Sequence, residues 1–146
     1  MKTKVLGLAL LCALLTASSS LATGQPSIAK ALAVGKMQAT TIHATSGAMI
    51  LERYTIKPGG SFGWHVHGAP VAVVVTGGTL TVFDPSVNAC APFKVGKGQS
   101  FVEPANHVHL ARNDGTRQAT VYALYLGVPK PSDAYIQKAQ PAGCDA

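Results

Sequence analysis

Residues 58–78, PGGSFGWHVHGAPVAVVVTGG, are the stretch that decides the fold. His65 and His67 are separated by one residue, and a run of β-branched residues follows them. On a β-strand, residues two apart lie on the same face, roughly 6–7 Å apart along the strand. The stretch therefore places two imidazoles side by side on one wall, an arrangement that suits a metal ion.

A second stretch, residues 98–113, reads GQSFVEPANHVHLARN and supplies His107 and His109. Pro104-Ala105-Asn106 predicts a turn before these histidines, and Asn113-Asp114-Gly115 predicts a turn after them. We interpret this segment as the partner of the first.

Short apolar segments separated by glycine and proline turns make up most of the chain, and no long helix is predicted after residue 22. This pattern predicts an all-β sandwich or barrel in one domain. Gly77-Gly78, between two apolar runs, predicts a hairpin. The expected strands cover residues 48–57, 71–76, 79–83, 93–102, 107–112 and 117–126.

The first 22 residues have the pattern of a secretory signal peptide. Lys2 and Lys4 make the start positive, residues 5–15 are apolar but too short to span a membrane, and Ser20-Leu21-Ala22 resembles a cleavage site. The alternatives are a membrane anchor or a buried helix. We therefore expect a periplasmic or secreted protein with no membrane contact after cleavage.

Removing these residues lowers the net charge from +6 to +4, because 10 basic and 6 acidic residues remain. The remaining charges are scattered, and no basic stripe is interleaved with aromatic residues, so nucleic acid is not an expected partner. Cys90 and Cys144 also remain. In an oxidising compartment an even count favours a disulfide, which would hold the C-terminal tail to the loop after Phe83. The alternative is two unpaired thiols.

The two histidine stretches resemble the paired motifs of the cupin superfamily. The first motif is glycine, His-x-His, glutamate and glycine at fixed spacing, and Gly59, His65, His67 and Gly78 match everything except the glutamate. The second is matched, with Asn106 in place of a glycine, by the following residues: Gly98, Pro104, His109 and Asn113.

The resemblance implies a single cupin jelly-roll β-barrel with a metal held by His65, His67 and His109. The usual glutamate is Val71, or Ala72 on a longer spacing, and neither can bind a metal. His107 and Glu103 are the two residues that could restore a fourth ligand. The alternative for His107 is a surface histidine at the barrel mouth, and the alternative for Glu103 is a solvated carboxylate in a turn.

Three neutral imidazoles with open positions suit a divalent transition metal. We expect iron (Fe) first, with Zn, Cu, Ni, Co or Mn as alternatives. Similar three-histidine sites occur in ferrous thiol and ring-cleaving dioxygenases of the superfamily, so the resemblance implies a metal-dependent oxygenase acting on a small organic substrate. A non-catalytic module that binds a small ligand or a metal is the alternative. In another alternative, the metal was lost with the glutamate and the histidines serve packing.

The expected organisation is a signal peptide at residues 1–22, an N-terminal arm at 23–47, the barrel at 48–128 and a C-terminal tail at 129–146. The expected partner is a small molecule. A homodimer is also possible through the region of residues 28–42.

Overall fold

The computed structural model describes residues 30–146 of the chain. The predicted signal peptide at residues 1–22 lies outside them. Among the residues described, no helix is long and apolar enough to cross a membrane.

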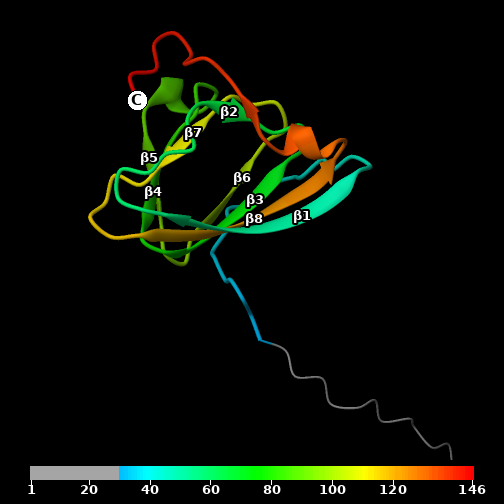
Figure 1. Ribbon diagram of the computed structural model, residues 1–146, viewed down its shortest axis with the longest axis horizontal. Helices are drawn as coiled ribbons and strands as arrows, with labels where there is room; N and C mark the ends of the chain where they lie inside the picture. The colour runs from blue at the N-terminus through cyan, green and yellow to red at the C-terminus, as the bar shows by residue number, and fades with distance from the viewer. Residues whose placement is uncertain (1–29) are drawn as a thin grey trace, which may run out of the picture. The chain divides into compact units, whose positions relative to one another are not determined.

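Two antiparallel sheets form the domain, and Figure 1 shows them facing one another. One sheet has the order β1-β8-β3-β6, and the other has the order β5-β4-β7. The first comprises β1 (Ala48–Ile56), β8 (Ala119–Val128), β3 (Val71–Gly77) and β6 (Ser100–Glu103), and the second comprises β5 (Phe93–Gly96), β4 (Thr79–Phe83) and β7 (Leu110–Arg112). The predicted all-β jelly-roll barrel is confirmed.

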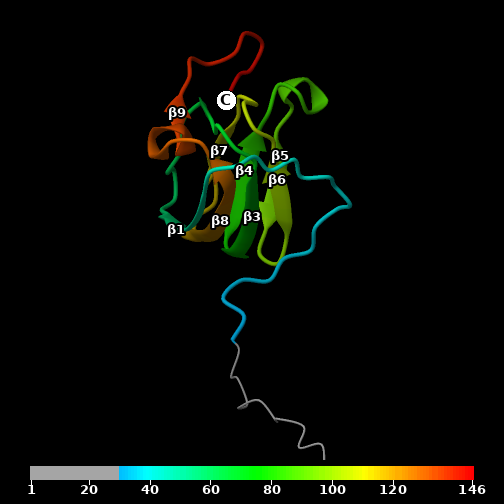
Figure 2. The same ribbon diagram turned by 90° about the vertical axis from the view of Figure 1, so that its right-hand side faces the viewer.

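The core lies between the two sheets and follows from alternation along their strands. Val71, Val73 and Val75 of β3 are buried, whereas the residues between them are half-buried. Their neighbour β8, which lies beside β3 in Figure 2, alternates in the same way. β-Branched side chains therefore fill the space between the sheets, which is what this residue type favours.

The predicted hairpin at Gly77-Gly78 is wrong. β3 pairs with β8 and β6, and β4 pairs with β5 and β7, so the chain passes from one sheet to the other at these glycines. Gly78 has φ +68°, and a Cβ there would lie 2.7 Å from the Cα atom of Ala119. Glycine is thus needed because the corner is tight and left-handed, not because two strands pair across it.

The C-terminal tail returns to the end of the barrel that carries the histidine stretch (Figure 1). It forms a 3-10 turn, η2 (Pro131–Ala134), and a short strand, β9 (Ile136–Gln137), which pairs with β2 (His65–Val66). A disulfide then joins Cys144 to Cys90, in the short turn η1 (Asn88–Cys90). This confirms the predicted pairing, and it fastens the tail to the loop after Phe83.

Trp64 packs in the small apolar cluster around this disulfide, with Phe83 and Leu110. It therefore points away from its neighbour His65, as strand alternation predicts. The cluster thus joins the tail to β4, to β7 and to the residue that precedes β2.

Candidate metal centre

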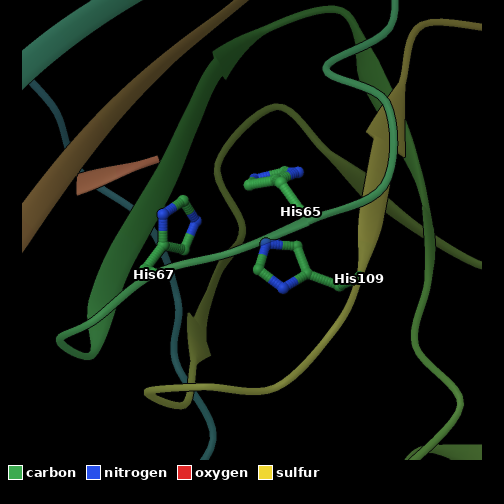
Figure 3. A group of neighbouring side chains, drawn as sticks. All are labelled: His65, His67 and His109. Carbon is green, nitrogen blue, oxygen red and sulfur yellow. The ribbon is translucent and has the colours of Figure 1, made fainter. Parts of the chain in front are cut away.

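His65, His67 and His109 converge at one end of the barrel (Figure 3). The two stretches meet through a pair of backbone hydrogen bonds, in which His65 and His109 each donate N–H to the other's carbonyl at 2.9 and 3.0 Å. The exposed fractions of the three residues are 4%, 3% and 1%. One donor atom from each ring lies within 4.8 Å of the others.

Backbone carbonyls fix the orientation of each ring. The Nδ1 atom of His65 lies 2.9 Å from the carbonyl of Gly63, that of His67 lies 2.5 Å from the carbonyl of Ala134, and that of His109 lies 2.9 Å from the carbonyl of His107. A carbonyl can only accept, so each Nδ1 carries a proton and each neutral ring keeps a lone pair on Nε2. Hydrogen bonds from Nδ1 to a carbonyl are typical of histidines that bind a metal through Nε2.

Glu103, the last residue of β6, reaches the same point. Its carboxylate oxygens lie 3.2 Å from Nε2 of His67 and 3.3 Å from Nε2 of His109, and the residue is buried. In the register of β3 and β6, Glu103 stands directly opposite Val71. A carboxylate is thus present one strand away from the position where the cupin motif has its glutamate.

The site has a surplus of acceptors when the rings are neutral. Nε2 of His109 is buried and has no hydrogen-bond partner with good geometry, although a carboxylate oxygen is close to it. Two acceptors at this distance repel one another unless a proton or a cation lies between them. The residues therefore fit a bound metal ion, whose ligands would be such lone pairs.

The pKa values of Glu103, His65 and His109 are shifted by burial and by the closeness of these groups to one another. Burial raises the pKa of Glu103, but the hydrogen bonds and charges of His109 and His67 outweigh it and lower the pKa to about 2. Burial and the neighbouring His109 lower the pKa of His65 to about 4. Burial also lowers the pKa of His109, but the Glu103 carboxylate outweighs it and raises the pKa. The pKa shifts of His109 and Glu103 thus have the same cause, which is the closeness of the carboxylate to this ring.

The structure does not bring His107, the other predicted fourth ligand, to this group. Its side chain is exposed, and its Nδ1 atom lies 3.2 Å from the hydroxyl of Ser86. Only its backbone carbonyl contacts the site, through His109.

Tyrosines that our sequence analysis did not single out surround the histidines. The ring of Tyr135 stacks on His65 with centroids 4.7 Å apart, and its hydroxyl donates to the carbonyl of Phe62 at 2.6 Å. The edge of Tyr125 meets His67, with centroids 5.2 Å apart, and its hydroxyl lies 2.9 Å from that of Tyr54. No local pattern could have placed Tyr135 here, because it comes from the tail after the last long strand.

Tyr54 and Tyr125 both stay protonated. Burial, with a hydrogen bond to Glu52, raises the pKa of Tyr54 to about 12, and burial with the hydrogen bond to Tyr54 raises the pKa of Tyr125 further. Both rings line a cavity inside the barrel of about 30 Å³, which His65, His67 and Glu103 also border. This volume holds about one water molecule.

The family model described as a cupin domain matches residues 52–125. The match covers half of the chain and includes both histidine stretches, so the chain belongs to the cupin family. No curated protein matches the chain in sequence.

Solved structures that resemble the chain have the same fold. A conserved protein with a double-stranded beta-helix domain from Klebsiella pneumoniae is 14% identical, with a TM-score of 0.52 over 68% of this chain and 81% of its own. An oxalate oxidase is 25% identical, with a TM-score of 0.51 over 61% of this chain and 45% of its own. The DMSP lyase DddQ from Ruegeria pomeroyi is 18% identical, with a TM-score of 0.53 over 64% and 44%. This chain therefore spans less than half of the length of the oxidase and the lyase.

Proposed function

We propose that this cupin binds a divalent transition metal through His65, His67 and His109 and acts as a metal-dependent oxygenase on a small organic substrate. The observation that carries the proposal is the convergence of three buried histidine rings, each of which has its Nδ1 atom against a backbone carbonyl. Building such a group without a cation would be costly, because one of its atoms has no partner.

Glu103 is the proposed fourth ligand. Among the residues described, it is the only carboxylate that forms an ion pair with any of the three histidines, and it pairs with His67 and His109. The three neutral imidazoles add no charge, and the single negative charge of Glu103 would partly neutralise a divalent ion. Iron is the first expectation for the metal, and Zn, Cu, Ni, Co and Mn remain alternatives with the same ligand preferences.

The chemistry of the metal would be the activation of oxygen and substrate at its open coordination positions. This chain's own residues would prepare the site. Tyr135 holds the ring of His65 by stacking, and its hydroxyl is engaged by the carbonyl of Phe62. Phe62 and Phe101 border the inner cavity and give it apolar walls. The likeness to an oxalate oxidase supports oxidative chemistry, although oxalate itself is not part of the proposal.

A non-catalytic binding module is the second candidate function. The cavity that His65 and His67 border inside the barrel has a volume of only about 30 Å³, so this cavity itself does not hold an organic substrate. Metal binding without turnover would agree with this closed interior.

Elemental analysis is the first test. The protein, expressed with its leader, should contain one equivalent of metal, and the His65→Ala/His67→Ala variant should contain none. Oxygen uptake by the iron-loaded protein in the presence of candidate substrates then separates the oxygenase from the binding module. Absence of metal from the wild-type protein, even after anaerobic reconstitution, would overturn both functions.

The location and organisation of the protein are also proposals. The disulfide between Cys90 and Cys144 indicates an environment outside the reducing cytoplasm, which supports a periplasmic or secreted protein. The proposed barrel, residues 48–128, begins with β1 and ends with β8, and the arm at 23–47 and the tail at 129–146 flank it.

A homodimer through the N-terminal arm remains part of the proposal. Leu32, Val34 and Met37 are exposed apolar residues in this arm, and β1 is an edge strand with exposed Met49 and Leu51. Exposed edges and apolar side chains of this kind favour association. Light scattering of the mature protein, with and without residues 23–42, would decide its oligomeric state.

A further inference from the structure

A second cavity lies beside His109 and Glu103, and no role has been assigned to it. Its volume is about 310 Å³, at the lower end of the range of about 300–1,000 Å³ that is typical of ligand pockets. Phe93, Phe101 and Val87 are among its apolar lining residues. It is roughly ten times larger than the cavity inside the barrel.

One end of this cavity is polar. Asp84, Ser86 and His107 line it there, and the same three residues line an adjoining hollow of about 400 Å³ that is more open. Glu103 and His109 border the cavity as well. The two hollows together form a route from the surface to the candidate metal ligands.

Asp84 is a buried carboxylate, 7% exposed, that forms no ion pair with a lysine or arginine among the described residues. Its Oδ1 atom accepts hydrogen bonds from the backbone N–H and the hydroxyl of Ser86, at 2.8 and 2.6 Å. A carboxylate has about four acceptor sites, so part of its capacity remains free. A buried carboxylate without a cationic partner is unfavourable, and a ligand cation would stabilise it.

The charges around both hollows also favour a cationic ligand. No lysine or arginine is among their lining residues, whereas Asp84 and Glu103 are both carboxylates. Asp84 lines both hollows, whereas Glu103 lines only the one that borders His109. A cationic group placed at Asp84 is attracted by its carboxylate, and an anionic group placed there is repelled.

We infer that this cavity, which we call the Asp84 pocket, binds a small organic amine, with its ammonium group at Asp84 and its apolar body against Val87, Phe93 and Phe101. The pocket places the body of the amine next to His109 and Glu103. That this amine is the substrate of the metal centre rests on the proposed function. Binding itself requires the pocket alone.

Three compounds with the same ring test the inference: benzylamine, benzyl alcohol and benzoate. Their binding to the metal-free and metal-loaded protein is measured by titration, with amide chemical shifts to locate the site. We expect benzylamine to bind at least tenfold more tightly than the other two in both forms. The shift changes should centre on Ser86, Val87 and His107.

Asp84→Asn is the informative variant, because the amide oxygen can still accept the hydrogen bonds of Ser86. It should weaken benzylamine about tenfold or more and leave benzyl alcohol unchanged. Asp114→Asn, which alters an exposed carboxylate paired with Arg112, is the matched control and should change neither.

Equal affinity for benzylamine in the Asp84→Asn variant, tighter binding of benzoate, or no binding of any of the three compounds would overturn the inference. Should Asp84→Asn not fold, shift changes in the wild-type protein away from the Asp84 pocket would do the same. Metal content is measured separately, so failure of the metal site and failure of the pocket are distinguishable.

Discussion

The chain contains the tripeptide His-Val-His twice, and the two copies behave differently. In residues 65–67 both imidazoles reach the candidate metal centre, whereas in residues 107–109 only His109 does. The second stretch contributes Glu103 to the group in place of a second histidine. Each stretch thus provides two candidate metal ligands, although they are of different kinds.

The two copies differ in what lies next to them. The first is held on both sides, by the tail strand β9 and by the backbone of His109. The second begins in a turn, where Asn106 has φ +61° and donates its N–H to the carbonyl of His67. His107 therefore leaves the turn facing outward, and regular alternation begins only after it. Identical local sequences receive different roles because their tertiary neighbours differ.

Replacing the two histidines of the second copy one at a time should give the largest contrast in metal affinity. His109→Ala removes a buried donor atom, and we expect the affinity for Zn or Co to fall by at least about a hundredfold. His107→Ala should leave the affinity within about twofold, because its ring is exposed. Competition titration with a chelating dye measures both. Equal losses in the two variants would mean that both histidines of the second copy bind the metal.

Exchanging Val71 and Glu103 tests whether the Glu103 carboxylate is a metal ligand. Glu103→Val should weaken metal binding roughly 10–100-fold. Because the two residues are opposite each other in register, the double variant Val71→Glu/Glu103→Val should recover part of that affinity. The absorption spectrum of the Co-loaded protein reports whether the carboxylate is a ligand. An unchanged affinity in Glu103→Val would show that the histidines alone hold the metal.

The disulfide should matter more for stability than for metal binding. Cys90 and Cys144 are 54 residues apart, so their bond stabilises the fold by about 4 kcal/mol in the chain-entropy model. Cys90→Ala/Cys144→Ala should lower the free energy of unfolding by a comparable amount. The metal affinity should fall less than tenfold, because β9 still pairs with β2. Denaturant unfolding and chelator competition separate the two effects, and a larger loss of affinity would make the disulfide essential to the first copy.

The two copies should also respond oppositely to pH in the metal-free protein. Burial lowers the pKa of His65 from 6.5 to about 4, so stability should fall as the pH decreases from 6.5 to 4. The raised pKa of His109 contributes stability below pH 6.5 that is lost as the pH rises through the folded-state value.

Unfolding of His65→Gln and His109→Gln between pH 4 and pH 8 measures these contributions. Relative to the wild type, the first variant should lose less stability on acidification, and the second should lose more. Identical pH profiles in both variants would contradict the assigned charge states.

Tyr135→Phe should have the smallest effect. It keeps the ring on His65 and removes only the hydroxyl that donates to Phe62. We expect a loss of about 1 kcal/mol in the free energy of unfolding and an unchanged metal affinity. Tyr135→Ala, which also removes the stacking, is the comparison that shows how far the ring supports His65.

The amino-acid sequence by itself determined the class of fold and most of the strands. The local features are period-2 alternation, glycine turns and the two histidine motifs. All three are consistent with a jelly-roll barrel. The pairing of Cys90 with Cys144 also followed from a count of two cysteines in an oxidising compartment. Strand spacing predicted that His65 and His67 share a face, and the resemblance to the cupin motifs added His109.

Only the tertiary structure decided how the segments combine. Gly77-Gly78 predicts a hairpin locally, yet both neighbouring strands have other partners. Glu103 and His107 were equal candidates in the sequence, and strand register brought the carboxylate, not the imidazole, to the histidines. Tyr135 acquires its position from contacts with His65 and Phe62, which lie far away along the chain. Distances between such segments depend on sheet pairing and burial, which no local pattern of residues encodes.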